Sequence, residues 1–474
     1  MRRGSRDEQR PMGRGGRGPR GGRPVEDPAR LTAYQALLAV HRDDAYANLV
    51  LPHLMREIGI SGRDAAFATE LTYGTLRHRG ALDAIIARAA SRDVARIDPP
   101  ARDALRLGAY QLLHTRVPAH AAVASTVDLV RAVAPGATGF ANAVMRKIGE
   151  RDLDGWLGLI APSEKDDPVG HLALVGNHPE WIVRAFREAL GGALDETRRA
   201  LEADNERPEV HLCARPGLMD AADLAEQTGG TPGAFSPYAV YMHEGAPGDL
   251  PSIRDGLAHV QDEGSQLVAM ALLDTPLEGR DERWLDLCAG PGGKAGLLAA
   301  VAAQRNAHVT AVEVNEHRAN MVANAVRGLP AEVLCEDGRE IGPYGYFDRV
   351  LVDAPCTGLG SLRRRPESRW RKQPSDLPPL TKLQRELLAA ALRAVRPGGL
   401  VAYVTCSPHA VETQMTLRET LKRVGTGGAF DLLDARQSLP DGMPGLGDGP
   451  TVQLWPHRHG TDAMFLSILR RKTS

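Results

Sequence analysis

Two cysteines lie in short motifs whose residue types suit covalent chemistry. Cys356 stands in DAPCTGLG, residues 353–360, and Cys406 stands in YVTCS, residues 403–407. A cysteine thiolate is a strong nucleophile, so either residue could form a covalent bond with a substrate. A buried cysteine is more often an inert, small apolar side chain, and we interpret the other three in this way: Cys213, Cys288 and Cys335.

A glycine-rich stretch, WLDLCAGPGGK at 284–294, predicts a buried strand that runs into a tight turn, with a helix behind it. Glycine lets the backbone approach a ligand closely, and a helix N-terminus offers unpaired N–H groups. Gly290, Gly292 and Ala295 satisfy a loose dinucleotide fingerprint, although Lys294 is unusual within it. A Walker phosphate loop is excluded because Lys294 is not followed by Ser or Thr. The turn alone therefore leaves the nucleotide cofactor open.

Polar or reactive side chains follow five predicted strands at the point where each strand ends. From about residue 283, strands alternate with helices, which predicts a mostly parallel sheet covered on both faces. Ligands of such sheets bind beyond the carboxyl ends of the strands, so these side chains are expected to share one crevice. The predicted strands end at Leu287, Val312, Leu334, Val352 and Thr405, and the side chains that follow are Cys288, Glu313, Asp337, Asp353 and Cys406.

Length and composition limit the class of protein. A chain of 474 residues predicts two or three domains. It has no apolar run of membrane-spanning length and no signal-peptide pattern, and its five cysteines show neither CxxC nor zinc-ligand spacing. We therefore expect a cytoplasmic protein with free thiols, no membrane association and no structural metal.

The net charge of −1 conceals a basic N-terminus, because residues 1–24 hold eight arginines against Asp7 and Glu8. Glycine and proline fill the rest, so this tail, taken as residues 1–28, is predicted to remain disordered. It is either a solvated tail or a nucleic-acid-binding arm.

The remaining chain divides into predicted domains by composition and periodicity. Apolar stripes at helical spacing predict an all-α domain over residues 29–150, followed by a polar linker at 151–177. A small α/β subdomain is expected over 178–258, and the strand–helix alternation belongs to a domain over 259–474.

These motifs together resemble the RsmB-type (Fmu/Sun) RNA cytosine-5 methyltransferases. The helical domain, through HAAVASTVDLVRA and GFANAVMRK, resembles the NusB-type fold, whose family binds RNA; the apolar stripes by themselves also suit a packing domain without a ligand. One departure is Glu412-Thr413, where the family usually has Glu-Asn. Further motifs that carry the resemblance are QDEGSQ at 261–266, CAGPGGK at 288–294, DAPCTGLGSLRRRPESRWR at 353–371, LQRELLAAAL at 383–392, TCS at 405–407 and GTDAMF at 460–465.

The resemblance implies a Rossmann-like α/β methyltransferase domain, an N-terminal NusB-like domain and a small α/β subdomain between them. It implies transfer of a methyl group from S-adenosylmethionine to C5 of a cytosine in RNA, with 16S rRNA the expected partner of a monomeric enzyme. By resemblance Cys406 is the nucleophile that adds to C6, Cys356 assists product release, and Asp353 binds the cytosine amidine edge. Lys294 is expected to contact the base or cofactor near the reacting centre.

For the cofactor, the resemblance implies that Glu313 holds the ribose hydroxyls and Asp337 the adenine amino group. The turn is expected to hold the methionine end. The predicted cofactor-binding residues are Cys288, Ala289, Gly290, Pro291, Gly292, Gly293, Lys294, Glu313, Asp337 and Asp353.

A basic run follows the first cysteine motif. It is either a solvated face or an RNA-phosphate contact in which Trp370 stacks on a base, and we favour the RNA contact. Glu367 within the run is a candidate to pair with one arginine. The predicted RNA-binding residues are Arg363, Arg364, Arg365, Arg369, Trp370 and Arg371.

Three rival classes explain less of the sequence. A DNA cytosine-5 methyltransferase would use the Pro-Cys motif and leave Thr405-Cys406-Ser407 unexplained. A dinucleotide-dependent dehydrogenase would leave both cysteine motifs unexplained, and a non-enzymatic RNA-binding assembly factor would leave the whole crevice unexplained.

Overall fold

The computed structural model describes residues 27–424 and 428–473, which form two compact units. The first holds most of the chain up to Trp156. The second holds Tyr46–Asn48, Leu76–Ala81 and the chain from Leu157 onward. The predicted arginine-rich tail lies outside the described residues, apart from Asp27 and Pro28, where the first helix is capped and begins.

The first unit is helical, as predicted for residues 29–150. The Asp27 side chain accepts a hydrogen bond from the Arg30 backbone N–H and so caps the first helix. Apolar side chains at helical spacing, including Leu37, Leu82 and Leu105, are buried and form its core. The helices that lie wholly or partly in this unit are α1 (Pro28–Arg42), α2 (Ala47–Ile58), α3 (Gly62–Arg77), α4 (Arg79–Ala90), α5 (Pro99–His114), α6 (Ala119–Val133), α7 (Thr138–Ile148) and α8 (Leu153–Ile160).

The segment 151–177, predicted as a polar linker, contains two helices, and the boundary between the two compact units falls within it, between Trp156 and Leu157. It contains α8 and α9 (Pro168–Val175), and the Asp167 side chain caps α9 through the Gly170 N–H. Trp156 is buried and donates to the Ile148 carbonyl, while Leu172 packs into an apolar cluster. A few apolar residues within a polar stretch are therefore enough to fold it onto its neighbours.

The small α/β subdomain predicted over 178–258 contains a four-stranded antiparallel sheet. Its strands, in the order β2-β3-β1-β4, are β1 (Val210–Ala214), β2 (Thr231–Pro232), β3 (Ala239–Met242) and β4 (Ala258–Val260). The accompanying helices are α10 (Glu180–Ala189), α11 (Leu194–Asn205), α12 (Ala221–Thr228) and α13 (Pro251–Arg254).

The second sheet positions the predicted chemistry. Its main order is β10-β12-β9-β8-β5-β6-β7, and β11 pairs with β12. Strands β5 to β9 are parallel, whereas β10, β11 and β12 pair antiparallel. The strands are β5 (Arg283–Asp286), β6 (His308–Val312), β7 (Ala331–Leu334), β8 (Phe347–Asp353), β9 (Val395–Thr405), β10 (Phe430–Leu433), β11 (Val452–Gln453) and β12 (Phe465–Arg471).

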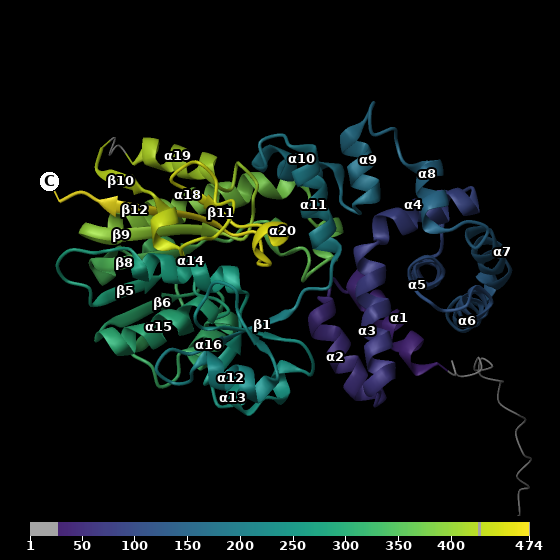
Figure 1. Cartoon of the computed structure of the whole chain (residues 1–474), viewed down its shortest axis with the longest axis horizontal. Helices are drawn as coiled ribbons and strands as arrows, with labels where there is room; N and C mark the ends of the chain where they lie inside the picture. Colours follow the sequence, from purple (N-terminus) through teal and green to yellow (C-terminus); the bar gives the residue numbers. More distant parts are fainter. Residues whose placement is uncertain (1–26, 425–427, 474) are drawn as a thin grey trace, which may run out of the picture. The chain divides into compact units, whose positions relative to one another are not determined.

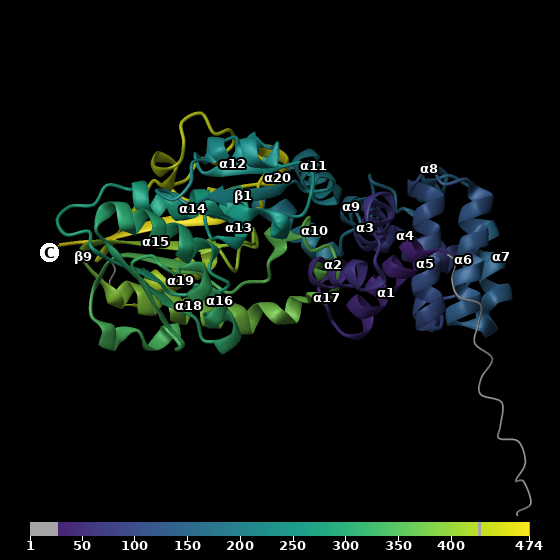
Figure 2. The ribbon, with the colours of Figure 1, turned by 90° about the horizontal axis from the view of Figure 1, so that it is seen from below.

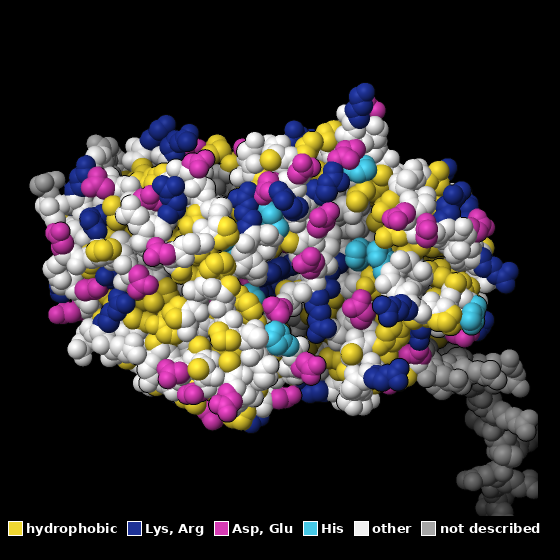
Figure 3. Space-filling view, viewed as in Figure 1, with side chains coloured by type: hydrophobic (Ala, Val, Ile, Leu, Met, Phe, Trp, Pro, Cys, Tyr) yellow, Lys and Arg dark blue, Asp and Glu magenta, His cyan; other side chains and the backbone are white. Residues whose placement is uncertain are grey.

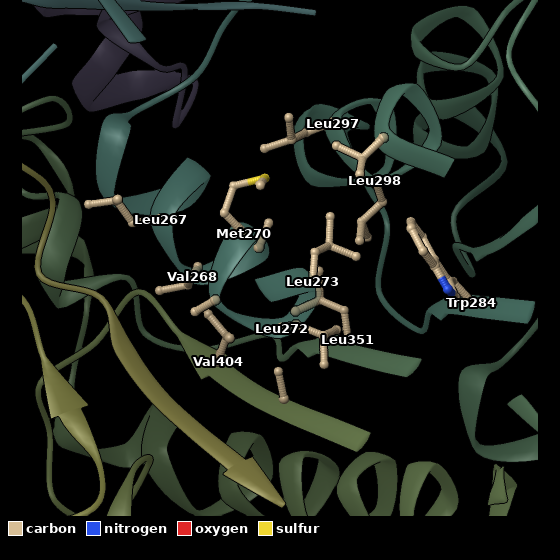
Figure 4. Close-up of a cluster of buried hydrophobic side chains, with 14 of the residues drawn as sticks. Leu267, Val268, Met270, Leu272, Leu273, Trp284, Leu297, Leu298, Leu351 and Val404 are labelled. Carbon is tan, nitrogen blue, oxygen red and sulfur yellow. The ribbon is translucent and has the colours of Figure 1, made fainter. Parts of the chain in front are cut away.

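Helices cover both faces of this sheet (Figures 1 and 2). On one face lie α14 (Glu263–Asp274), α15 (Gly293–Arg305) and α16 (Glu316–Ala325); on the other lie α18 (Leu377–Ala394) and α19 (Gln414–Arg423). Figure 4 shows the core under α14 and α15, where Leu272 and Leu298 meet Leu351 of β8 and Val404 of β9. A second apolar cluster lies under α18. A Rossmann-like layered domain is therefore confirmed.

On the face of the molecule seen in Figure 3, Lys and Arg side chains are interspersed with Asp and Glu side chains. Among the described residues, no helix is both long enough and apolar enough to span a membrane.

Candidate active site

The five strand-end side chains lie around one cavity of about 550 Å³. Because β5 to β9 are parallel, their carboxyl ends meet at one edge of the sheet, which places the residues that follow them together. The crevice predicted from the strand ends is therefore present. The cavity is lined by Cys288, Glu313, Asp337, Asp353 and Cys406, and also by Cys356.

The two motif cysteines face each other in this cavity. The Sγ atoms of Cys356 and Cys406 are 3.3 Å apart, and both thiols are free. Their strands are neighbours, since β8 pairs with β9 up to the Asp353 and Val404 pair. The hydrogen bond with Cys406, followed by burial, raises the pKa of Cys356 well above its usual value, which favours a protonated Cys356 thiol.

Lys294 and Asp353 form an ion pair beside the thiols. Lys294 Nζ lies 2.8 Å from Asp353 Oδ2 and 3.5 Å from Ser265 Oγ. Burial by itself lowers the pKa of Lys294, but the Asp353 carboxylate outweighs it, and the pKa lies above its usual value. Asp286, the last residue of β5, is fully buried nearby; burial and then the Asp353 charge raise its pKa to about 7.

The other three cysteines differ from one another. Cys213 is fully buried, and burial raises the pKa of its thiol, so the prediction of an inert apolar side chain suits it. Cys288 is half-buried and lines the cavity. Cys335 is exposed at the end of β7, so interpreting it as a buried side chain was wrong.

The glycine turn packs tightly against Glu313. A Cβ atom at Gly290 would lie 2.1 Å from Glu313 Oε2, so only glycine fits beside this carboxylate. Arg318, on the first turn of α16, donates to the Gly290 carbonyl at 2.5 Å and lies 3.4 Å from Glu313 Oε2. Arg318 also lines the cavity. Arg318 was not predicted from the sequence, because only its position five residues after Glu313 points to it.

The turn residues do not all face the cavity. Cys288, Gly290 and Pro291 line it. Ala289 is buried, and its N–H bonds the Val312 carbonyl, which ties β5 to β6. Gly292 has a φ of +112°, and a Cβ there would lie 2.6 Å from Ala325 Cβ. Gly292 thus serves the close approach of the turn to α16, and Gly293 is the first residue of α15.

Asp337 also lines the cavity and follows β7. In the strand order, β7 is separated by β5 and β6 from β8 and β9, which carry the thiols. Arg339 pairs with it at 2.5 Å and also binds Glu386 at 2.8 Å. The hydrogen bond from Arg339 holds the pKa of Asp337 below its usual value, so the carboxylate is charged and able to accept hydrogen bonds.

The structure contradicts an RNA-contact role for part of the basic run. Arg369 is fully buried and donates to the Asp204 carbonyl at 2.6 Å and to Asn205 Oδ1 at 2.6 Å. Arg363 is buried, and it shares the carboxylates of Asp262 and Asp462 with Arg364. These guanidinium groups join segments of the second unit; those of Arg363 and Arg369 are buried and not available to phosphates, whereas Arg364 is partly exposed. Among the described residues, no arginine forms an ion pair with Glu367, which accepts from the Ala47 N–H at 3.2 Å.

Trp370 is also less available than predicted. Its ring packs against Gly80, where a Cβ would lie 2.7 Å from the indole, and the Arg79 guanidinium lies 5.7 Å from the ring centroid. A different aromatic side chain, Tyr46, lines the cavity and is 40% exposed. The guanidinium groups of Arg365 and Arg371 lie 5.2 and 5.4 Å from the Tyr46 ring centroid.

Arg365 and Lys372 line the cavity together with Tyr46. The position of Tyr46 in the cavity was not predicted, because this residue lies far from the motifs in the sequence. Within the described residues, no group of three or more His, Cys, Asp or Glu side chains is arranged to hold a metal ion.

Family comparisons agree with this architecture. Residues 271–470 match the 16S rRNA methyltransferase RsmB/F family, and residues 27–150 match the NusB family. The chain is 57% identical to the Mycobacterium tuberculosis protein Rv1407 over 458 residues, covering 96% of this chain and 99% of that protein. It is 31% identical to the ribosomal RNA small subunit methyltransferase B of Escherichia coli O6:K15:H31 over 436 residues, covering 89% of this chain and 96% of that protein.

Solved structures share the fold. PH0851 has a TM-score of 0.76 at 23% identity, covering 94% of this chain and 99% of its own. NSun6 from Pyrococcus horikoshii, solved with SFG, has a TM-score of 0.53 at 16% identity, covering 62% of this chain and 98% of its own. The fold and site define an S-adenosylmethionine-dependent RNA methyltransferase. The chain belongs to the RsmB/F family of 16S rRNA methyltransferases.

Proposed function

We propose that this protein methylates C5 of a cytosine in 16S rRNA through a covalent bond between Cys406 and C6 of the base. The observation that carries the proposal is the pair of thiols, 3.3 Å apart, in the cavity that also holds the glycine turn and Glu313. The E. coli relative is named for ribosomal RNA small subunit methylation, which supports the choice of substrate.

The residue types suit the chemistry of cytosine C5, which is a poor nucleophile until a thiolate adds at C6. In this proposal Cys406 forms the bond to C6, which makes C5 able to accept the methyl group. Loss of the C5 proton to a base then lets the Cys406–C6 bond break, and the thiolate leaves. Cys356, whose raised pKa favours the thiol, lies close enough to Cys406 to assist that release by proton transfer.

In this proposal Lys294 and Asp353 orient the base. The Asp353 carboxylate, 26% exposed and paired with Lys294, can accept hydrogen bonds from the N3–H and amino group of a protonated cytosine. A protonated N3 draws electron density from C6 and so favours addition by Cys406. The partial burial of this pair reduces competition from water and strengthens both interactions.

The cavity also fits S-adenosylmethionine, which supplies an activated methyl group when bound. The Gly290 position leaves no room for a Cβ beside Glu313, which suits close approach of a ligand to the backbone. We propose that Glu313 accepts from the ribose hydroxyls and Asp337 from the adenine amino group. The remaining cavity-lining turn residues, Cys288, Gly290 and Pro291, would face the methionine end.

RNA contact is proposed for the residues of the basic run nearest Tyr46, of which Arg365 is exposed and Arg371 and Lys372 are partly exposed. Arg365, Arg371 and Lys372 offer positive charge near Tyr46, whose exposed ring suits stacking with a base that flanks the target. This assignment replaces Arg363, Arg364, Arg369 and Trp370.

RNA carrying tritium at cytosine C5 tests the reaction directly. Methylation at C5 must release that tritium to water, in proportion to the methyl groups transferred. We expect release that needs S-adenosylmethionine and is absent in Cys406→Ala. Methyl transfer without tritium release would show that another atom is modified and would overturn the proposal.

A further inference from the structure

Glu412 follows both cysteine motifs in the sequence and is fully buried, with its carboxylate in contact with both motifs. Its Oε1 accepts from the Thr357 N–H at 2.8 Å, and its Oε2 accepts from the Thr357 hydroxyl at 2.5 Å. The same Oε2 accepts from the Ser407 hydroxyl at 2.7 Å. Thr357 directly follows Cys356, and Ser407 directly follows Cys406. One carboxylate therefore joins the two segments that carry the thiols.

The rest of the surroundings fixes Glu412 in place. Gln384 on α18 donates to Glu412 Oε1 at 3.2 Å and to the Pro355 carbonyl at 2.9 Å. The Tyr403 hydroxyl donates to the Glu412 carbonyl at 2.6 Å. A buried carboxylate is costly unless hydrogen bonds satisfy it, and here four donors do so. Glu412 is thus held from the strand side and the helix side.

We propose that Glu412 is a positioning residue that sets the distance between the two thiols, acting on Cys356 through Thr357 and on Cys406 through Ser407. This inference rests on the proposed function, in which both thiols act on one cytosine. Cys406 must be free to reach C6, while Cys356 must remain near enough to assist release. The negative charge of Glu412 also adds to the causes that raise the pKa of Cys356, after its hydrogen bond with Cys406 and its burial.

The two connections make different predictions. Ser407→Ala removes the hydrogen bond from the Cys406 segment to Glu412, so formation of the covalent enzyme–RNA adduct should slow by about tenfold or more. Thr357→Val removes the hydroxyl that holds the Cys356 segment, so the adduct should form at the normal rate but decay about tenfold more slowly. A purely structural Glu412 would instead give both variants the same modest loss in both steps.

Disulfide capture measures the thiol geometry without RNA or cofactor. Diamide oxidises two neighbouring thiols to a disulfide and is itself reduced to the hydrazine, so the rate of Cys356–Cys406 closure reports how often the sulfur atoms meet. We expect Glu412→Gln and Ser407→Ala to slow closure by at least tenfold. The control is Thr420→Val, which removes a buried hydroxyl that binds the Thr416 carbonyl away from both cysteines.

Closure at the wild-type rate in Ser407→Ala and Thr357→Val would overturn the inference, even if Glu412→Gln failed to fold. The outcome is separable from the proposed function. An enzyme that releases tritium but closes the disulfide independently of Glu412 refutes only the positioning role. Glu412-dependent closure in a protein that never releases tritium refutes C5 methylation.

Discussion

Lys294 Nζ and Asp353 Oδ2 lie 2.8 Å apart, which joins the glycine turn after β5 to the first cysteine motif after β8. The two residues are 59 positions apart in the chain. Lys294 follows β5, Asp353 is the last residue of β8, and β5 and β8 are parallel neighbours. The ion pair therefore spans the carboxyl edge of the sheet. This contact links the expected cofactor end of the cavity to the expected cytosine end.

We expect Lys294→Met to lower kcat on the order of 10²-fold or more, because it leaves the Asp353 carboxylate uncompensated beside the thiols. Steady-state kinetics with saturating RNA and S-adenosylmethionine would measure the loss. Lys382→Met is the control, since this lysine is 75% exposed on α18 and makes only a weak ion pair with Glu386. A change confined to KM would show that the ion pair serves binding alone.

Substitution of Cys406 and substitution of Cys356 should block different steps of the reaction. Cys406→Ala should form neither covalent adduct nor product, because no nucleophile adds to C6. Cys356→Ala should add and methylate but release slowly, so a protein–RNA band should survive denaturing gel electrophoresis. A mechanism of the DNA-methyltransferase type predicts the reverse pattern. An adduct formed by Cys406→Ala would therefore contradict the assignment.

Glu313→Ala should weaken S-adenosylmethionine binding by roughly 10- to 100-fold, since charge-assisted hydrogen bonds are worth about 1.5–3 kcal/mol. Isothermal titration would measure the change in Kd. Glu332→Ala provides a matched control, because Glu332 is an exposed acid on β7 whose side chain accepts from the Thr310 hydroxyl and does not line the cavity. Equal affinity in Glu313→Ala and wild type would remove Glu313 from the cofactor site.

The position of the site was predictable because it depends on topology. Strand ends could be located from apolar runs, and a parallel sheet brings its carboxyl ends together, so Glu313, Asp353 and Cys406 were found together. The buried role of Arg369 was not predictable, because its acceptors at Asp204 and Asn205 are 165 and 164 residues away. Sequence alone shows an arginine's charge but not the carbonyl groups that surround it.

Asp286 should make the free energy of unfolding depend on pH. Its pKa is raised to about 7 in the fold, first by burial, so the native state holds this proton more tightly than the unfolded chain does. The stabilisation is complete below the ordinary aspartate pKa and is lost as pH rises toward 7. Between pH 5 and pH 8 this group should cost about 2–3 kcal/mol.

Denaturant unfolding at the two pH values would measure the effect, and Asp286→Asn should remove that part of the pH dependence. An identical pH dependence in the variant and the wild type would show that Asp286 is ionised throughout.

Tyr46 provides the sharpest test of RNA recognition. Stacking of a base on an aromatic ring is worth about 1–3 kcal/mol, so Tyr46→Ala should raise the KM for RNA by roughly 5- to 150-fold. S-adenosylmethionine affinity and kcat at saturating RNA should be unchanged, because the Tyr46 ring contacts the guanidinium groups of Arg365 and Arg371 at the cavity wall.

The matched control is Tyr346→Ala: this tyrosine is 55% exposed, lies 5.8 Å from the Arg471 guanidinium and does not line the active-site cavity. If Tyr46→Ala and Tyr346→Ala raised KM equally, general loss of an exposed aromatic ring would explain the effect. If Tyr46→Ala alone raised KM while Tyr46→Trp restored it, stacking beside the target cytosine would be supported.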